Sequence, residues 1–184
     1  ILLGSTTSYG NGDLDILMIK IDDEGEEQWM RNYGIGSNDI GQAIVQTRDG
    51  GYMIQFLVEG YGHGNSATGL MKLNSAGDVL WTNAFGGTVN TMSKMFSKIN
   101  SNEYISVCSQ IDYSSNTSNT WMIKIDDEGE IIWERIFGKL GKDDGFSAIP
   151  TFDGGFIFTG RSNSSVNDDE NLFDLWLLKT DPSG

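Results

Sequence analysis

The chain has 184 residues, 38% of them hydrophobic, which is enough for a domain with its own hydrophobic core. Its 26 acidic and 12 basic residues give a net charge of -14, which disfavours nucleic acid and anionic lipid as partners. No apolar run approaches the roughly 18 residues of a membrane-spanning helix, and the single cysteine, Cys108, leaves no disulfide within the chain.

The first elements predicted along the chain are short β-strands. Residues 1–8 form one strand-like run, which lacks the basic flank of a signal peptide. Four more runs follow, rich in Ile, Val, Met and aromatic residues, at 15–21, 26–33, 41–47 and 52–58. Between them, Asp-Asp-Glu-Gly at 22–25 and Arg-Asp-Gly-Gly at 48–51 predict tight hairpins in which Gly takes a positive φ. No segment shows sustained helical periodicity, so the sequence predicts an all-β fold.

The same pattern recurs every 52 residues. Three columns show the period clearly: Trp29, Trp81 and Trp133; Gly25, Gly77 and Gly129; and Lys20, Lys72 and Lys124. Several columns at one period indicate internal duplication. We place the repeats at 15–66, 67–118 and 119–172, with partial repeats at 1–14 and 173–184.

A unit of four short antiparallel strands is typical of a β-propeller blade. We therefore predict a single β-propeller over residues 1–184, whose 14 strands form about three and a half to four blades. The strands at 41–47, 93–99 and 145–151 carry small residues and are predicted to be innermost. The Trp strands are then predicted to be outermost, with each Trp packed between blades. Because four full blades would need two more strands, we expect a part of a larger propeller, or self-association through open blade edges.

The repeat "DILMIKIDDEGEEQWMRNYGIGSNDIGQAIVQTRDGGYMIQFLVEG" resembles the β-propeller repeats of secreted and surface proteins of bacteria and archaea. Those repeats run Lys-Leu-Asp-x-x-Gly-x-x-x-Trp, then Phe-Gly-Gly, an Asp, and Asp-Gly-Gly-Tyr. The resemblance implies an extracellular or cell-surface location and a scaffold or adhesive role. A weaker similarity is to quinoprotein-like propellers, although the spacing from Asp to Gly differs here by one residue. The second repeat departs from the pattern, since Asn102-Glu103 replaces Gly50-Gly51, which indicates that this hairpin tolerates side chains.

The acidic run at 22–24 looks like part of a calcium loop, which needs six to eight oxygen ligands. The second repeat keeps the following Gly but has Asn-Ser-Ala at 74–76 in place of the acids. We therefore interpret the run as a hairpin. On the opposite edge of the predicted blades, Asp39, Asp143 and Asp144 are candidate calcium ligands, and no other cofactor is expected.

Catalytic residues are not predicted. His63, the sole histidine, lies in a Gly-rich loop and offers no partnered base for a Ser or Cys nucleophile. Carboxylate pairs leave glycosidase chemistry open, but nothing in the sequence singles out one pair. An enzymatic role is therefore the less favoured class.

The long loops are predicted to share one edge of the blades and to form the partner face. They lie at 58–66, 110–118 and 161–172, joined by 34–40, 86–92 and 138–144. Two of them carry sequons for glycosylation, at Asn116 and Asn163. Tyr61, His63 and Tyr113 are the candidate exposed contacts of this face.

These features favour a non-enzymatic extracellular or cell-surface β-propeller. It would act as a structural, adhesive or protein- or glycan-binding module, within a surface assembly or a filament. One alternative is a fragment of a propeller enzyme, quinoprotein-like or glycan-active, whose catalytic residues lie in other blades. A second alternative is an intracellular interaction scaffold.

Overall fold

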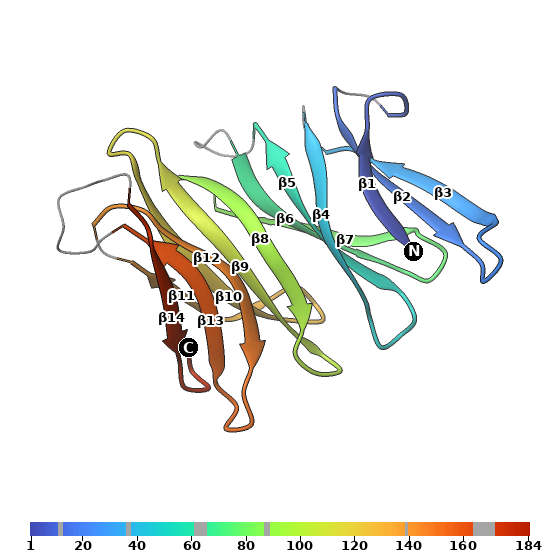
Figure 1. Ribbon diagram of the computed structural model, residues 1–184. Helices are drawn as coiled ribbons and strands as arrows, with labels where there is room; N and C mark the ends of the chain where they lie inside the picture. Colours follow the sequence, from blue (N-terminus) through green and yellow to red (C-terminus); the bar gives the residue numbers. More distant parts are fainter. Residues whose placement is uncertain (11–12, 36–37, 61–65, 87–88, 139, 164–171) are drawn as a thin grey trace. The chain divides into compact units, whose positions relative to one another are not determined.

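The computed structural model of the chain describes residues 1–184 except 11–12, 36–37, 61–65, 87–88, 139 and 164–171. The described residues form 14 β-strands and no helix (Figure 1). Their bounds are β1 Leu2–Thr6, β2 Asp15–Ile21, β3 Glu27–Tyr33, β4 Asp39–Gln46, β5 Tyr52–Glu59, β6 Ser66–Leu73, β7 Val79–Phe85, β8 Asn90–Lys98, β9 Glu103–Asp112, β10 Thr117–Asp126, β11 Ile131–Phe137, β12 Asp143–Pro150, β13 Phe156–Ser162 and β14 Asp174–Lys179. In this part of the chain, no helix could cross a membrane.

The strands form four antiparallel sheets in chain order. The two middle sheets have four strands, β4-β5-β6-β7 and β8-β9-β10-β11, and the outer two have three, β1-β2-β3 and β12-β13-β14. Figure 1 shows each sheet as a run of neighbouring strands that follow one another in sequence. The predicted all-β class and the number of strands are confirmed, and each complete sheet has the Trp strand at one edge and the strand rich in small residues at the other.

The chain divides into two compact units, Ile1–Thr88 and Val89–Gly184, each built from two sheets. Each unit has its own hydrophobic core. The core of the first unit includes Ile16, Met18, Ile54, Phe56 and Met71, and that of the second includes Ile105, Val107, Met122, Phe156 and Phe158. Burial of this apolar area is the main favourable term that holds the two sheets of each unit together.

In the first unit, a Trp and a Tyr of the β1–β3 sheet pack against the next sheet. The ring of Trp29 meets that of Tyr52 edge to face, with 6.3 Å between the ring centroids. The Tyr33 hydroxyl donates a buried hydrogen bond of 2.6 Å to the carbonyl oxygen of Gly77, in the hairpin between β6 and β7. The repeated Trp and the repeated hairpin Gly therefore meet across neighbouring sheets.

The second unit repeats this packing 104 residues further on. Trp133 meets Phe156 of the next sheet edge to face, with 5.6 Å between the centroids. Arg135 lies over the Trp133 ring, as Arg31 lies over that of Trp29 in the first unit. The repetition indicates that the period encodes the contact between successive sheets as well as the strands.

Short parallel bridges join the two sheets of each unit at the edge that carries the long loops, here called the long-loop edge. Leu14, before β2, pairs with Asn38, before β4, and Ser118 pairs with Lys142 in the equivalent place of the second unit. Ser118 ends the predicted long loop 110–118 and Lys142 belongs to 138–144, so residues of these two loops lie on one edge in the second unit, as the sequence predicts. The short hairpins lie at the other ends of the same antiparallel strands.

The acidic hairpins are held by their first residue. In the hairpin that follows β2, Asp22 Oδ1 accepts hydrogen bonds from the amides of Glu24 and Glu26. Asn74 Oδ1 does the same in the second repeat, and the following Gly25 and Gly77 take φ of 88° and 86°. Because an amide oxygen replaces the carboxylate without loss of the turn, this position serves hairpin geometry.

Candidate functional site

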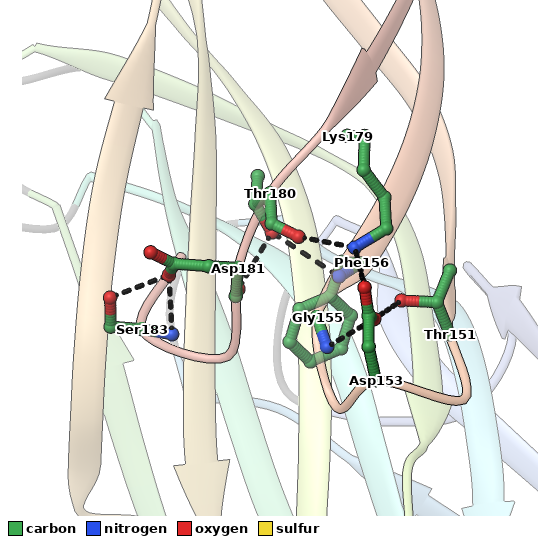
Figure 2. Close-up of polar contacts among 8 residues, drawn as sticks. All are labelled: Thr151, Asp153, Gly155, Phe156, Lys179, Thr180, Asp181 and Ser183. Atoms are coloured by element: carbon green, nitrogen blue, oxygen red, sulfur yellow. Dashed lines mark hydrogen bonds and ion pairs between the residues drawn. The ribbon is translucent and has the colours of Figure 1, made fainter.

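A lysine and an aspartate fasten the hairpins of the fourth sheet, as Figure 2 shows. Lys179 Nζ donates to both carboxylate oxygens of Asp153, at 3.0 and 2.8 Å, and to the carbonyl oxygen of Thr180, at 2.7 Å. Asp153 Oδ1 also accepts hydrogen bonds from the Thr151 hydroxyl and the Gly155 amide. These contacts, led by the one with Lys179, hold the pKa of the Asp153 carboxyl well below its usual range.

We call this contact, between a lysine and an acid of the preceding hairpin, the clasp. The same clasp occurs twice earlier in the chain, wherever both the lysine and the preceding hairpin are present. In the first, the buried Lys72 ammonium lies 3.4 Å from Asp49 Oδ2. In the second, Lys124 pairs with Glu103 at 2.9 Å, so the acid has moved two positions along the hairpin. The clasp explains why lysine recurs at this position of the repeat. It also gives these charged side chains a structural role.

The hairpin of the second repeat also differs in its backbone. A Cβ placed on Gly51 would come within 2.2 Å of the carbonyl oxygen of Leu73, so no side chain fits there. Glu103 occupies this position in a hairpin whose amides, from Ile99 and Asn100, both donate to the Glu103 carbonyl oxygen. The hairpin of the second repeat therefore accommodates a side chain, as expected, but only because its turn differs from that of the first repeat.

Two of the candidate calcium ligands are buried at the start of equivalent strands. Asp39 begins β4, where its Oδ2 accepts a 2.6 Å hydrogen bond from the Ile35 amide. Asp143 begins β12 and accepts a hydrogen bond from the Ser162 hydroxyl. Within the described ranges, no group of three or more His, Cys, Asp or Glu side chains is arranged to hold a metal ion.

Asp144 is the centre of a buried network in the second unit. Its Oδ1 accepts hydrogen bonds from the hydroxyls of Ser109 and Ser118, at 3.2 and 2.9 Å. Its Oδ2 accepts two from the Arg161 guanidinium, both at 3.1 Å, and this guanidinium lies 4.3 Å from the ring centroid of Phe173. Four donors thus occupy this carboxylate, which joins β9, β10 and β13 to β12.

The remaining sequence candidates belong to the long-loop edge. Tyr113 is 69% exposed in the turn between β9 and β10, and Asn116 lies exposed in the same turn with a φ of 55°. Asn163 is half-buried just after β13. Tyr61 and His63 lie outside the described residues. The structure therefore places three of the five candidates of this face, all in the second unit.

A polar groove of about 340 Å³ brings the two sequon asparagines, Asn116 and Asn163, together at this edge. One wall is the turn at 115–117, where the hydroxyls of Ser115 and Thr117 share a 2.8 Å hydrogen bond. The turn begins at Asp112, whose Oδ1 accepts hydrogen bonds from the amide and hydroxyl of Ser114. These contacts, chiefly the one with the Ser114 hydroxyl, lower the pKa of Asp112 and fix the wall.

The other wall is the segment 140–142 together with Asn163. Asn163 Oδ1 accepts a 2.5 Å hydrogen bond from the Lys142 amide, and the Asn163 amide donates to the Lys142 carbonyl oxygen at 3.0 Å. The Gly141 carbonyl oxygen accepts from the Ser118 amide at 3.0 Å, which joins this wall to β10. Both walls are therefore positioned by backbone contacts between the two sheets.

The groove offers hydroxyl and amide groups and one cation. Lys142 lines it, and among the described residues its ammonium makes no ion pair or hydrogen bond. The exposed Leu140 adds an apolar group to the second wall, and the exposed Tyr113 lies in the same turn as the first wall. Such a surface can bind a hydroxyl-rich ligand through hydrogen bonds and stack an aromatic ring on it.

Comparison of the sequence with known protein families and with curated proteins finds no match.

Proposed function

We propose that the sheets are blades of a β-propeller and that the chain is a non-enzymatic, extracellular or cell-surface binding module. The repeated packing supports the propeller, because Trp29 on Tyr52 and Trp133 on Phe156 make the same contact between successive sheets. A four-stranded sheet cannot bury both faces alone, and radial stacking of such sheets is how propellers bury them. The resemblance of the repeats to secreted propellers supports the location.

The partner proposed for this module is a glycan, bound at the long-loop groove of the second unit. The composition of the groove supports this partner, because Asn116, Thr117 and Lys142 line one cavity and the exposed Tyr113 belongs to the turn that forms one wall. Amide and hydroxyl groups match sugar hydroxyls, and an aromatic ring covers a sugar face. The Lys142 ammonium favours glycans that carry a carboxylate over neutral ones.

Binding of the purified chain to a panel of immobilised neutral and uronic-acid oligosaccharides tests this proposal. Tyr113→Ala is expected to weaken binding by roughly three- to tenfold, the range expected for loss of one stacking contact. Phe152→Ala is the matched control, because Phe152 is a fully exposed aromatic on the opposite, hairpin edge. Lys142→Gln should weaken binding of uronic-acid oligosaccharides more than binding of neutral ones.

Two results would contradict the proposal. One is that no member of the panel binds. The other is that Phe152→Ala weakens binding as much as Tyr113→Ala does. Measured hydrolysis of a panel member that a single substitution on this edge abolishes would instead show an enzyme.

A further inference from the structure

A cavity of about 530 Å³ lies between the two sheets of the first unit, apart from the groove described above. It is lined by residues of both sheets, among them Asp15 and Tyr33 from the β1–β3 sheet and Met71 and Val79 from the β4–β7 sheet. Its volume is in the range of small-molecule sites, about 300 to 1,000 Å³. Size and enclosure by two sheets therefore suit a small ligand.

The carboxylate of Asp15 lies at this cavity with 2% of the residue exposed. Two glycines leave room for it: a Cβ on Gly34 would come within 2.1 Å of Oδ1, and a Cβ on Gly10 would come still closer to Oδ2. Within the part of the chain that the structure describes, no donor reaches this carboxylate. Asp144, by contrast, receives four hydrogen bonds in the second unit.

A largely buried carboxylate that makes no contact with a protein donor keeps only the little water that reaches it from the cavity. A ligand that brings a charged donor would recover part of the cost of this burial on binding. Asp39, which is also buried, begins β4 beside this junction, where its amide donates to the carbonyl oxygen of Leu14 at 2.6 Å. The site therefore selects for a cationic donor.

The walls distinguish an organic cation from a metal ion. Met71, Val79 and Ile35 are apolar, and Asp15 is the one carboxylate among the lining residues. Calcium needs six to eight oxygen ligands, which this lining does not supply. We propose that the cavity binds a primary alkylammonium ion, with its ammonium on Asp15 and its alkyl chain against Met71 and Val79.

The second unit holds an equivalent cavity, of about 410 Å³, that serves as an internal comparison. Its Phe137, Gly138 and Leu178 stand where the first cavity has Tyr33, Gly34 and Met71. The repeat places Asn119 at the position of Asp15, and a Cβ on Gly138 would come within 2.3 Å of Asn119 Oδ1. An amide thus fits this position without loss of the fold.

The experiment compares butylammonium with 1-butanol, its neutral counterpart of similar length, on the intact chain by calorimetry and amide NMR. Wild type should bind butylammonium at least about tenfold more tightly, the difference expected for a charged hydrogen bond. Asp15→Asn should remove this preference while the unfolding temperature stays the same or rises. Asp13→Asn, which removes an exposed charge two residues away, should retain the preference.

The NMR shifts provide a readout that needs no variant. Butylammonium should shift the amides of Gly34 and Ile35 saturably in wild type at physiological salt. Equal affinity for the two probes, shifts spread over exposed acidic residues, or an unchanged preference in folded Asp15→Asn would each overturn the proposal. None of these outcomes bears on glycan binding in the second unit, so the two proposals fail separately.

Discussion

The Tyr33 hydroxyl donates a 2.6 Å hydrogen bond to the Gly77 carbonyl oxygen and so ties the first sheet to a hairpin of the second. The equivalent positions of the later repeats, Phe85 and Phe137, have the same ring without the hydroxyl. Tyr33→Phe should therefore keep the packing and lose about 0.5–1.5 kcal/mol of unfolding free energy, the net value of one such bond. Urea denaturation measures this loss. Tyr9→Phe, at an exposed tyrosine, is the control and should change nothing.

Tyr33 also makes the folded chain sensitive to alkali. Burial raises the pKa of Tyr33 from 10.0 to about 12, because the phenolate would lose its hydration. The folded chain therefore holds this proton more tightly than the unfolded chain, and its contribution to stability is complete below pH 10 and falls as the pH rises toward 12. Denaturation curves between pH 8 and pH 11.5 should show a smaller decline for Tyr33→Phe than for wild type. Equal declines would contradict this assignment.

The lysine clasps should differ in strength according to the burial of the lysine. The Lys72 side chain is 3% exposed, whereas that of Lys179 is 42% exposed. Asp49→Asn removes the anion that pairs with a buried ammonium and should cost about 1–2 kcal/mol, a range lowered for the exposure of Asp49. Asp153→Asn should cost less, because water replaces the lost contact. Thermal unfolding of the two variants decides the order, and a larger effect at Asp153 would show that burial does not govern it.

The clasps also predict the response to acid. The hydrogen bond with the Thr47 hydroxyl, together with Lys72, lowers the pKa of Asp49, and Lys124 lowers that of Glu103. Carboxylates with depressed pKa values contribute fully above their unfolded values of about 4, and the contribution is lost as the pH falls further. Stability should therefore decline from about pH 4 downward, and the decline should be smaller in Lys124→Met. If the stability of Lys124→Met declined with acid as steeply as that of wild type, the result would contradict this role of the Lys124–Glu103 pair.

The two sequons should differ in occupancy. Asn116 is exposed at a turn, whereas Asn163 is half-buried and its Oδ1 accepts the Lys142 amide hydrogen. A glycosylating host that secretes the chain should modify Asn116 more completely, as peptide mass mapping would show. Asn116→Gln should remove most of the added mass. Higher occupancy at Asn163 would mean that its bond to Lys142 opens readily.

The strands and hairpins could be predicted from the sequence because their signals are local. The run 15–21 and the turn 22–25 became β2 and its hairpin with the expected bounds and a positive φ at Gly25. The repeated lysine was visible too, but its partner was not. The acid lies on the preceding hairpin and shifts from Asp49 to Glu103 between repeats, so no single column reveals it.

The sites depended on contacts that only the folded chain displays. Asp144 was a candidate ligand by its type, but Ser109, Ser118 and Arg161 come to it from three strands distant in sequence. The sequence does not single out Lys142, because the equivalent position in the first unit is Asn38 and no local pattern indicates a groove. The 52-residue period does identify Asn119, two repeats further on, as the counterpart of Asp15.

Amide NMR of the intact chain, titrated with the panel of neutral and uronic-acid oligosaccharides, shows whether the groove of the second unit binds glycans. Binding in the groove should produce saturable shifts at Ser115, Gly141 and Lys142, on the long-loop edge of the second unit, and none at the hairpin glycines Gly25 and Gly154. Shifts confined to the hairpin edge, or no shift with any member of the panel, would contradict it.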